Sequence, residues 1–322
     1  WNALKVWTSF YLTKWLKRPI QWGMPIAISF EPTTHCNLRC PECPSGLRSF
    51  TRPTGMLETA FFEKTINEVH RETMYLTFYF QGEPYLHPNF LSMVQYAHSK
   101  KIYTATSTNA HYLSDEKAKA TVESGLDRLI ISIDGTSQEV YEQYRIGGQL
   151  QKVLEGARNM VKWKTKLKSK KPFLIFQFLV VKPCEHQTED IKLLAKQIGV
   201  NDLWLKTAQI NDYQNDPHQL TPEQNKYSRY LKNKDGSVTP KNKLQNHCWK
   251  LWHANVITWD GKIVPCCFDK DAKHLLGNLK EESFKAIWRS KHYTEFRNKL
   301  VSGRKNTDIC TNCSEGLKVW SD

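Results

Sequence analysis

The chain has 322 residues, enough to bury a substantial core, and its composition of 40% hydrophobic and 24% charged residues is typical of a globular protein. Nine cysteines are too few for a disulfide scaffold of this length. Lys5, Lys14, Lys17 and Arg18 interrupt the apolar stretch that a signal peptide needs, and the longest apolar run, residues 173–181, is too short to cross a bilayer as a helix. We expect a reducing, cytoplasmic location, where clustered cysteines bind metal or do chemistry.

The net charge of +14 suggests an acidic partner. The lysines gather in residues 162–171 and 232–243, however, and no RNA-binding signature with interleaved aromatic residues appears there. This distribution argues against direct binding of nucleic acid.

The first predicted element is an amphipathic helix within residues 1–24, which are rich in tryptophan and lysine. Such a helix suits two placements, against the barrel formed by the following residues or on an anionic membrane, and we prefer the barrel. The membrane placement would put the protein at the inner membrane face and would suit a lipid-linked substrate. On a helical wheel two faces separate: Leu4, Trp7, Tyr11 and Trp15 share one face with Trp1 and Leu12, while Asn2, Ser9 and Thr13 lie opposite.

Residues 25–209 alternate between apolar strand patterns and helical patterns. The strands are expected at 25–30, 74–80, 102–108, 128–134, 173–181 and 202–206. The helices are expected at 57–71, 90–100, 114–124, 138–145, 150–168 and 189–198. Near-continuous apolar strands that alternate with helices predict a parallel sheet covered by helices. Six such units predict an α/β fold, a partial (β/α)6 TIM-like barrel with its chemistry in the loops after the strands.

The composition changes at residue 210. Residues 210–247 are polar and contain three prolines, which predicts a linker with at most one short helix. Residues 248–322 form a second module that contains five cysteines.

Three cysteines lie directly after the first strand, at Cys36, Cys40 and Cys43. Thiolates are soft ligands that suit iron–sulfur clusters, and three of them can hold a cubane while one iron keeps an open position. Buried free thiols and a three-cysteine zinc site are the alternatives. The position after the first strand favours the cluster.

Residues 25–209 resemble the radical S-adenosylmethionine (radical SAM) superfamily, in which a C-x3-C-x2-C motif follows the first strand. Four further stretches resemble the motifs of that family in the same order, and each lies at a strand end. They are "QGEP" (81–84), "STNA" (107–110), "SIDG" (132–135) and "YRIGG" (144–148). Gln81 and Ala110 stand where the family pattern has glycine.

The resemblance implies a [4Fe–4S] cluster on the three cysteines, with its open iron chelating SAM. Electron transfer from the reduced cluster would cleave the sulfonium bond and give a 5′-deoxyadenosyl radical, which removes a hydrogen atom from a substrate carbon. The implied SAM-binding residues are Gln81, Gly82, Glu83, Ser107, Asn109, Ser132 and Arg145. Asp134 is a candidate catalytic residue. From the residues alone, Glu83 and Asp134 also suit capping or turn roles, and Arg145 suits a solvated helix end.

The second module combines a predicted hairpin, whose turn is at Asp260-Gly261, with a C-x2-C pair near the end. It resembles the single-cluster twitch module and the shortened SPASM module. The resemblance implies one auxiliary [4Fe–4S] cluster, because five cysteines cannot ligate two four-iron clusters. The expected ligands are Cys248, Cys266, Cys310 and Cys313. Cys267 is an alternative to Cys266, and a four-cysteine zinc site is an alternative to the cluster.

Cys184 follows the fifth strand, so a hydrogen-donor role toward a substrate radical is one hypothesis and an inert buried thiol is the other.

The family resemblance implies an enzyme that oxidises, cross-links or epimerises a peptide or protein, with a flavodoxin- or ferredoxin-type electron donor. Two-electron dehydrogenation of a small polyol or aminocyclitol is the alternative. The basic charge slightly favours the peptide.

Overall fold

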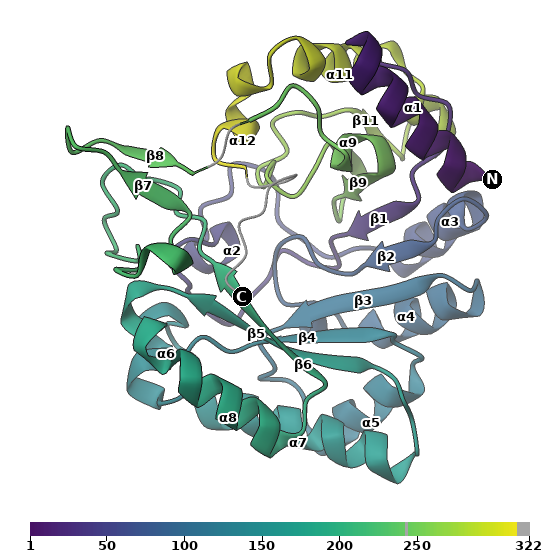
Figure 1. Ribbon diagram of the computed structural model, residues 1–322. Helices are drawn as coiled ribbons and strands as arrows, with labels where there is room; N and C mark the ends of the chain where they lie inside the picture. Colours follow the sequence, from purple (N-terminus) through teal and green to yellow (C-terminus); the bar gives the residue numbers. More distant parts are fainter. Residues whose placement is uncertain (242–243, 314–322) are drawn as a thin grey trace.

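The structure is a computed structural model that describes residues 1–241 and 244–313. Six parallel strands stand side by side in chain order. They are β1 (Ala27–Phe30), β2 (Tyr75–Thr77), β3 (Tyr103–Thr108), β4 (Arg128–Ser132), β5 (Phe173–Val180) and β6 (Asp202–Thr207). The predicted parallel α/β fold is confirmed, and the sheet is curved but does not close in the part of the chain described (Figure 1).

Helices connect these strands and cover the outer side of the sheet (Figure 1). They are α3 (Thr59–Val69), α4 (Phe90–Ser99), α5 (Asp115–Glu123), α6 (Gln138–Tyr144), α7 (Leu150–Lys166) and α8 (Thr188–Ile198). The short α2 (Pro44–Leu47) lies within the first loop. The predicted cap of α5 is confirmed, because Ser114 Oγ accepts a hydrogen bond of 3.2 Å from Lys117 N.

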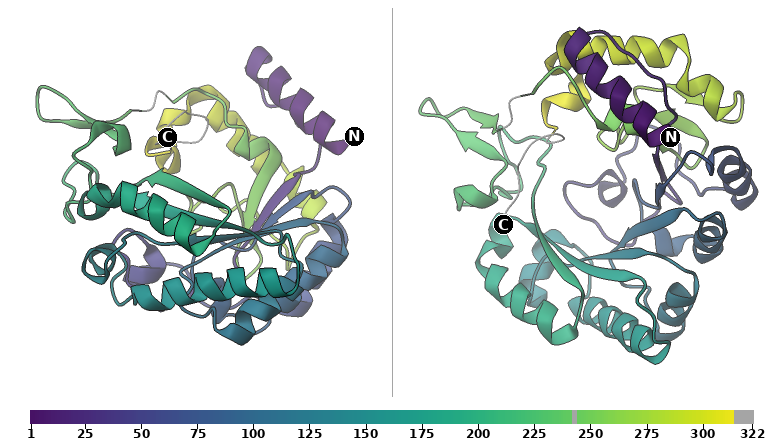
Figure 2. Two further views of the ribbon diagram at one scale, coloured as in Figure 1. Left: turned by 60° about the horizontal axis from the view of Figure 1, so that its bottom comes forward. Right: turned by 45° about the vertical axis from the view of Figure 1, so that its right-hand side comes forward.

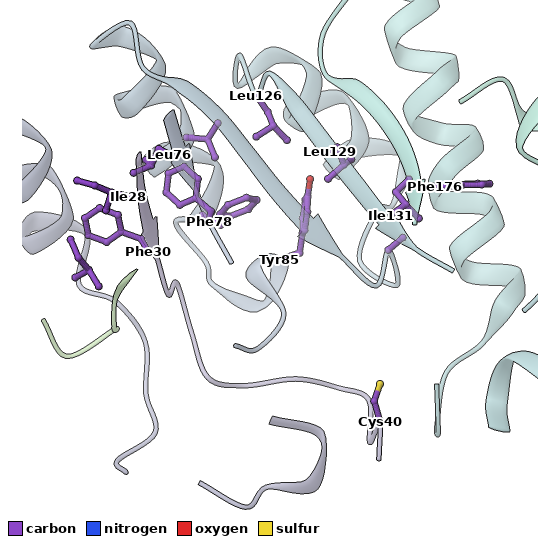
Figure 3. Close-up of a cluster of buried hydrophobic side chains, with 14 of the residues drawn as sticks. Ile28, Phe30, Cys40, Leu76, Phe78, Tyr85, Leu126, Leu129, Ile131 and Phe176 are labelled. Atoms are coloured by element: carbon purple, nitrogen blue, oxygen red, sulfur yellow. The ribbon is translucent and has the colours of Figure 1, made fainter. Parts of the chain in front are cut away.

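The main hydrophobic core lies between the strands and these helices. Side chains that alternate along the strands, such as Ile28, Phe30, Leu76 and Phe176, are completely or almost completely buried (Figure 3). Burial of each such side chain stabilises the fold by about 1.5–3 kcal/mol. Because the six strands are parallel, their carboxyl ends meet at one edge of the sheet, where the loops of the site begin.

The second module extends the barrel sheet. Strand β9 (Ala254–Ile257) pairs with β1 in parallel, and β10 (Lys262–Val264) and β11 (Gly277–Asn278) follow in antiparallel order. The predicted hairpin turn is confirmed, with Gly261 at a φ of +90°. Four helices complete the module: α9 (Lys250–His253), α10 (Phe284–Trp288), α11 (Lys291–Gly303) and α12 (Asp308–Thr311).

The segment predicted as a linker is more ordered than expected. Strands β7 (Tyr230–Lys232) and β8 (Val238–Pro240) form a separate hairpin within it. Leu220 and Tyr230 are buried, because the segment packs over the barrel rather than crossing solvent. The polar composition of the segment did not predict that these two apolar side chains would be buried.

Helix α1 (Asn2–Leu16) forms as predicted, but its neighbour and orientation differ from the prediction. It packs on the second module rather than on the six-stranded barrel, with the Phe10 ring 5.1 Å from that of Trp249. Its buried residues are Val6, Ser9, Phe10 and Thr13, so the aromatic face found on the helical wheel points outward. None of the described helices is long and apolar enough to cross a membrane.

Candidate functional site

The three cysteines of the first loop lie at the carboxyl end of β1, where the active-site loops of a barrel are found. Cys43 N donates to Cys40 O over 3.2 Å, and α2 begins at the next residue. Gly46 packs on this turn so closely that a Cβ there would lie 2.6 Å from Cys40 N. Cys40 is buried, and burial raises the pKa of the Cys36 thiol to about 12. The loop is therefore a compact, largely desolvated group of thiols.

The loop after β2 is fastened to this cysteine loop. Gly82 N donates to Ser45 Oγ over 2.9 Å, and Glu83 N donates to His35 O over 2.7 Å. Gly82 has a φ of +75°, and a Cβ there would lie 2.1 Å from Thr33 O, so glycine is required. The side chain of Gln81 points to the same place, with its Oε1 3.8 Å from Cys43 Sγ.

Glu83 joins the loops that follow β2 and β3. Its buried carboxylate accepts hydrogen bonds from Tyr85 N (3.2 Å), Thr108 Oγ1 (2.7 Å) and Asn109 N (2.8 Å). Burial raises the pKa of Glu83, and the three hydrogen bonds oppose that rise. The carboxylate is thus fully engaged by the protein and sets the shape of the pocket wall.

Asn109 extends this wall to the cysteine loop. Its Nδ2 donates to Asn37 Oδ1 over 2.8 Å and lies 3.9 Å from Cys36 Sγ. The predicted residues Ser107 and Ser132 also meet, with 3.3 Å between their hydroxyl oxygens. Neighbouring Ala110 has a φ of +63°, which explains why a glycine suits that position better.

The loop after β4 contributes a buried ion pair. Arg145 Nε lies 2.5 Å from Asp134 Oδ2, and Asp134 Oδ1 accepts from Leu179 N over 2.7 Å. Arg145 Nη1 lies 3.7 Å from Cys40 Sγ. Burial opposes the charge of Arg145, but the adjacent Asp134 carboxylate and the Cys40 thiol raise its pKa overall. Asp134 is thus bonded to Arg145 and to the backbone of Leu179, an arrangement that suits a positioning role better than a catalytic one.

Cys184 lies apart from this group. Its side chain is completely buried, its Sγ is 3.3 Å from Leu179 O, and burial raises the pKa of its thiol to about 12. A hydrogen donor must reach the substrate, so this position favours the inert buried thiol.

The second set of thiols gathers in the C-terminal module. Four cysteines line one small cavity together: Cys248, Cys266, Cys310 and Cys313. Cys267 is not among the residues that line it. Arg304 borders the same cavity, with Nη2 3.3 Å from Cys313 Sγ. Cys267 instead packs against Phe80, Val256 and Val264.

Within the described residues, no three Cys, His, Asp or Glu side chains are arranged to hold a single metal ion. A cubane holds its thiolates on separate irons and therefore farther apart than the ligands of one ion. Soft thiols at both places, bordered by the cations Arg145 and Arg304, fit negatively charged iron–sulfur clusters.

Sequence analysis missed three residues that build the site. Ser45, Thr108 and Asn37 make the hydrogen bonds that join the loops. Their signal was position alone, because each lies within or next to a recognised motif. A further contact is the ion pair in which Arg52 Nη1 and Nη2 donate to Glu31 over 2.9 and 2.5 Å. This pair is bonded to the second module, because Trp259 N donates to Glu31 and Arg52 Nε donates to Lys270 O.

Comparisons with known proteins agree with this geometry. Residues 30–166 match the radical SAM superfamily, and residues 248–314 match SPASM, an iron–sulfur cluster-binding domain. The chain is 28% identical over 311 residues to the tungsten-containing aldehyde ferredoxin oxidoreductase cofactor-modifying protein of Pyrococcus furiosus, covering 88% of this chain and 86% of that protein.

Two further proteins are similar over most of this chain. The S-adenosyl-L-methionine-dependent 2-deoxy-scyllo-inosamine dehydrogenase of Niallia circulans is 22% identical over 293 residues, covering 89% of this chain and 92% of that protein. The structure of Streptococcus suis SuiB bound to the precursor peptide SuiA shares the fold, with a TM-score of 0.67 and 12% identity, covering 99% of this chain and 76% of that chain.

The two family matches together account for both groups of thiols. A radical SAM domain binds SAM and a [4Fe–4S] cluster, and a SPASM domain binds auxiliary iron–sulfur clusters. The chain therefore belongs to the radical SAM superfamily of enzymes and carries a SPASM domain after its partial barrel.

Proposed function

We propose that this enzyme oxidises a carbon centre of a small polar substrate held between the strand ends and the SPASM domain. The observation that carries the proposal is the convergence of the Glu83 backbone and the Asn109 and Arg145 side chains, from three different strand ends, on one three-thiol loop. Such convergence of polar groups is typical of a ligand site rather than of a structural metal site.

The chain would bind SAM with residues that are already positioned. When bound, the cluster and SAM supply reductive cleavage of the sulfonium bond and a radical able to remove hydrogen from carbon. Gly82 lets the backbone approach closely, and Glu83 holds the two loops around the ligand. Arg145 Nη2 makes no hydrogen bond to the described residues, so it is available for the carboxylate of SAM. Gln81, Ser107 and Ser132 would complete the polar wall.

The substrate class follows from the inner face of the sheet. Ser132 on β4 pairs in register with Gln177 on β5, and Gln177 pairs with Trp204 on β6. Lys206 lies two residues after Trp204 and therefore on the same face of the sheet. These side chains present amide, hydroxyl and ammonium groups on one face. Two relatives that match over most of their length are named for acting on a cofactor and on an inosamine, and a third is named a heme synthase, which favours a small molecule.

A peptide or protein is the second candidate substrate. The net charge of +14 favours an acidic partner, which an acidic peptide would satisfy. The same charge suits an acidic flavodoxin- or ferredoxin-type protein as the electron donor. Incubation with small polyols and with acidic peptides, each scored for consumption of SAM, separates the two classes.

We further propose one auxiliary [4Fe–4S] cluster with Cys248, Cys266, Cys310 and Cys313 as its ligands. Their place around one cavity supports this set, and Cys267 lies outside it. Anaerobic reconstitution is expected to give about eight irons per chain. About four irons together with bound zinc would instead support the four-cysteine zinc site.

The direct test of the function is anaerobic turnover by the reconstituted and reduced protein. We expect formation of 5′-deoxyadenosine, which a Cys40→Ala variant should abolish while Cys184→Ala leaves it unchanged. Absence of the nucleoside from the reduced, fully iron-loaded protein would contradict the proposed function.

A further inference from the structure

Helix α1 is held by one narrow face and exposes the opposite one. Its inner residues Val6 and Phe10 are buried against the SPASM domain. Asn2 is fastened by a reciprocal pair of 2.9 Å hydrogen bonds with the backbone of Met24. The helix is therefore a fixed part of the domain, and it lies at the periphery of the molecule in both views of Figure 2.

The outer face of α1 is strongly apolar. Its large side chains are exposed to solvent: Trp1 (86%), Leu4 (52%), Trp7 (52%), Tyr11 (48%), Trp15 (78%) and Leu16 (41%). The rings of Trp7 and Tyr11 lie against each other at a tilt of 46°, with their centroids 4.6 Å apart. A helix that is apolar on both faces is normally covered on both. An apolar surface of this kind marks an interaction site.

We propose that the outer face of α1 docks on an anionic phospholipid bilayer. The composition of the face supports this partner, because tryptophan and tyrosine are the side chains that favour the interface between headgroups and acyl chains. This inference does not depend on the proposed reaction or substrate.

The charge around α1 is complementary to such a surface. The first 30 residues contain no aspartate or glutamate, and their four cations are Lys5, Lys14, Lys17 and Arg18. All four side chains are exposed. Lys5 and Lys14 lie on α1, and Lys17 and Arg18 follow directly after its last residue, Leu16. Each lysine or arginine near an anionic membrane strengthens binding about fivefold.

A groove beside α1 supplies a place for a headgroup phosphate. Trp1, Leu4 and Trp22 line it, and its charged lining residues, Lys5, Arg289 and Arg297, are all basic. Arg297 is 1% exposed, and its Nε and Nη2 have no hydrogen-bond partner among the described residues. A buried guanidinium with unsatisfied donors is suited to an anionic oxygen ligand.

A second copy of the chain fits this face less well than a bilayer does. A two-fold contact would bring the same surface against itself. It would therefore place the four cations of each α1 region opposite the same four cations, which is repulsive. An anionic bilayer offers the opposite charge together with an apolar layer.

Vesicle flotation of the full, cluster-reconstituted chain tests the proposal. We expect binding to vesicles of phosphatidylcholine with phosphatidylglycerol and at least tenfold weaker binding to pure phosphatidylcholine. The double variant Trp7→Gln/Trp15→Gln should lose at least tenfold in partition coefficient. Leu193→Gln, at a side chain 61% exposed on α8, is the matched control and should bind normally.

The charge contribution has its own pair of variants. Lys5→Glu/Arg289→Glu should weaken binding to the anionic vesicles at least tenfold, whereas Lys152→Glu/Lys196→Glu, with the same change in net charge elsewhere, should not. Unchanged iron content and thermal midpoint will show that the variants fold.

Three results would overturn the proposal. The first is absence of binding to the anionic vesicles. The second is equal binding to both vesicle types. The third is a lipid-free dimer, detected by light scattering, that Trp7→Gln/Trp15→Gln dissociates, because it would assign the face to a second copy.

Discussion

The two groups of thiols are held in different ways. At the barrel site, hydrogen bonds join the loops after β2 and β3 directly to the segment of Cys36, Cys40 and Cys43. Gly82 N donates to Ser45 Oγ, Glu83 N donates to His35 O, and Asn109 Nδ2 donates to Asn37 Oδ1. In the SPASM domain the four thiols come from three separated stretches and meet at one cavity. Arg304 also approaches one of those thiols, Cys313.

This difference indicates that the two sites depend to different degrees on metal binding for their folding. The parallel sheet preorganises the barrel site before any cluster is present, because strand pairing fixes where the loops begin. The SPASM thiols come from three separated stretches rather than from one loop, so metal binding should contribute a larger share of the folding free energy of that site.

The largest effect is expected from removal of an auxiliary thiol. Cys266→Ala should lose about four of about eight irons, because Cys266 lines the four-thiol cavity. Amide hydrogen exchange should rise in residues 248–313 and stay low in β3–β5. Cys267→Ala is the matched control and should keep its iron. Iron loss in Cys267→Ala but not in Cys266→Ala would show that Cys267, and not Cys266, is the ligand of the auxiliary cluster.

The next effect concerns the contact between the two regions. Glu31 follows β1, and Trp259 N of the SPASM domain donates to its carboxylate over 3.2 Å, while Arg52 Nε donates to Lys270 O over 3.0 Å. Arg52→Met leaves Glu31 charged and buried, which should lower the free energy of unfolding by about 3–5 kcal/mol.

Urea unfolding under anaerobic conditions measures this change. The double variant Glu31→Leu/Arg52→Met should recover most of the loss, because no buried charge is left without its partner. A loss below about 1 kcal/mol in Arg52→Met would mean that the pair behaves like a surface ion pair.

A smaller effect is expected at Gly82. Gly82→Ala places a Cβ 2.1 Å from Thr33 O at a φ of +75°, whereas Gly236→Ala meets nothing within 4 Å at a φ of +83°. Both share the backbone strain, so Gly82→Ala should cost about 1–3 kcal/mol more, from overpacking. It should also weaken SAM binding in equilibrium dialysis. An equal loss in the free energy of unfolding for Gly82→Ala and Gly236→Ala would show that the close contact with Thr33 O has no effect on stability.

The smallest effect is a stabilisation at Ala110. Its φ of +63° strains an alanine, so Ala110→Gly should raise the free energy of unfolding by about 0.5–1 kcal/mol. Ala118→Gly, inside helix α5, should instead lower it by about 1 kcal/mol. A loss of stability in both variants would show that Ala110 is not strained.

The sequence predicts the six strand units and the motif residues because local periodicity and strand-end position determine them. It does not predict that β9 joins the barrel sheet beside β1, since pairing between distant strands leaves no local pattern. The orientation of α1 is missed for a related reason. Both of its faces are apolar enough to pack, so the wheel alone cannot say which face is buried.

Ion pairs and hydrogen bonds between loops also leave no local pattern in the sequence. The Glu31–Arg52 pair joins residues on either side of the cysteine motif that belong to no motif themselves, and only the fold brings them to Trp259. Thr108 lies inside a recognised motif, yet its hydrogen bond to Glu83 depends on how β3 is oriented.

The central claim is that the barrel loop binds its cluster with three thiolates and leaves one iron for SAM. Electron paramagnetic resonance of the reduced Cys266→Ala protein, which should retain only the barrel cluster, tests this most directly. Addition of SAM is expected to change the signal of that cluster. An iron-loaded, reduced cluster whose signal is the same with and without saturating SAM would contradict the claim.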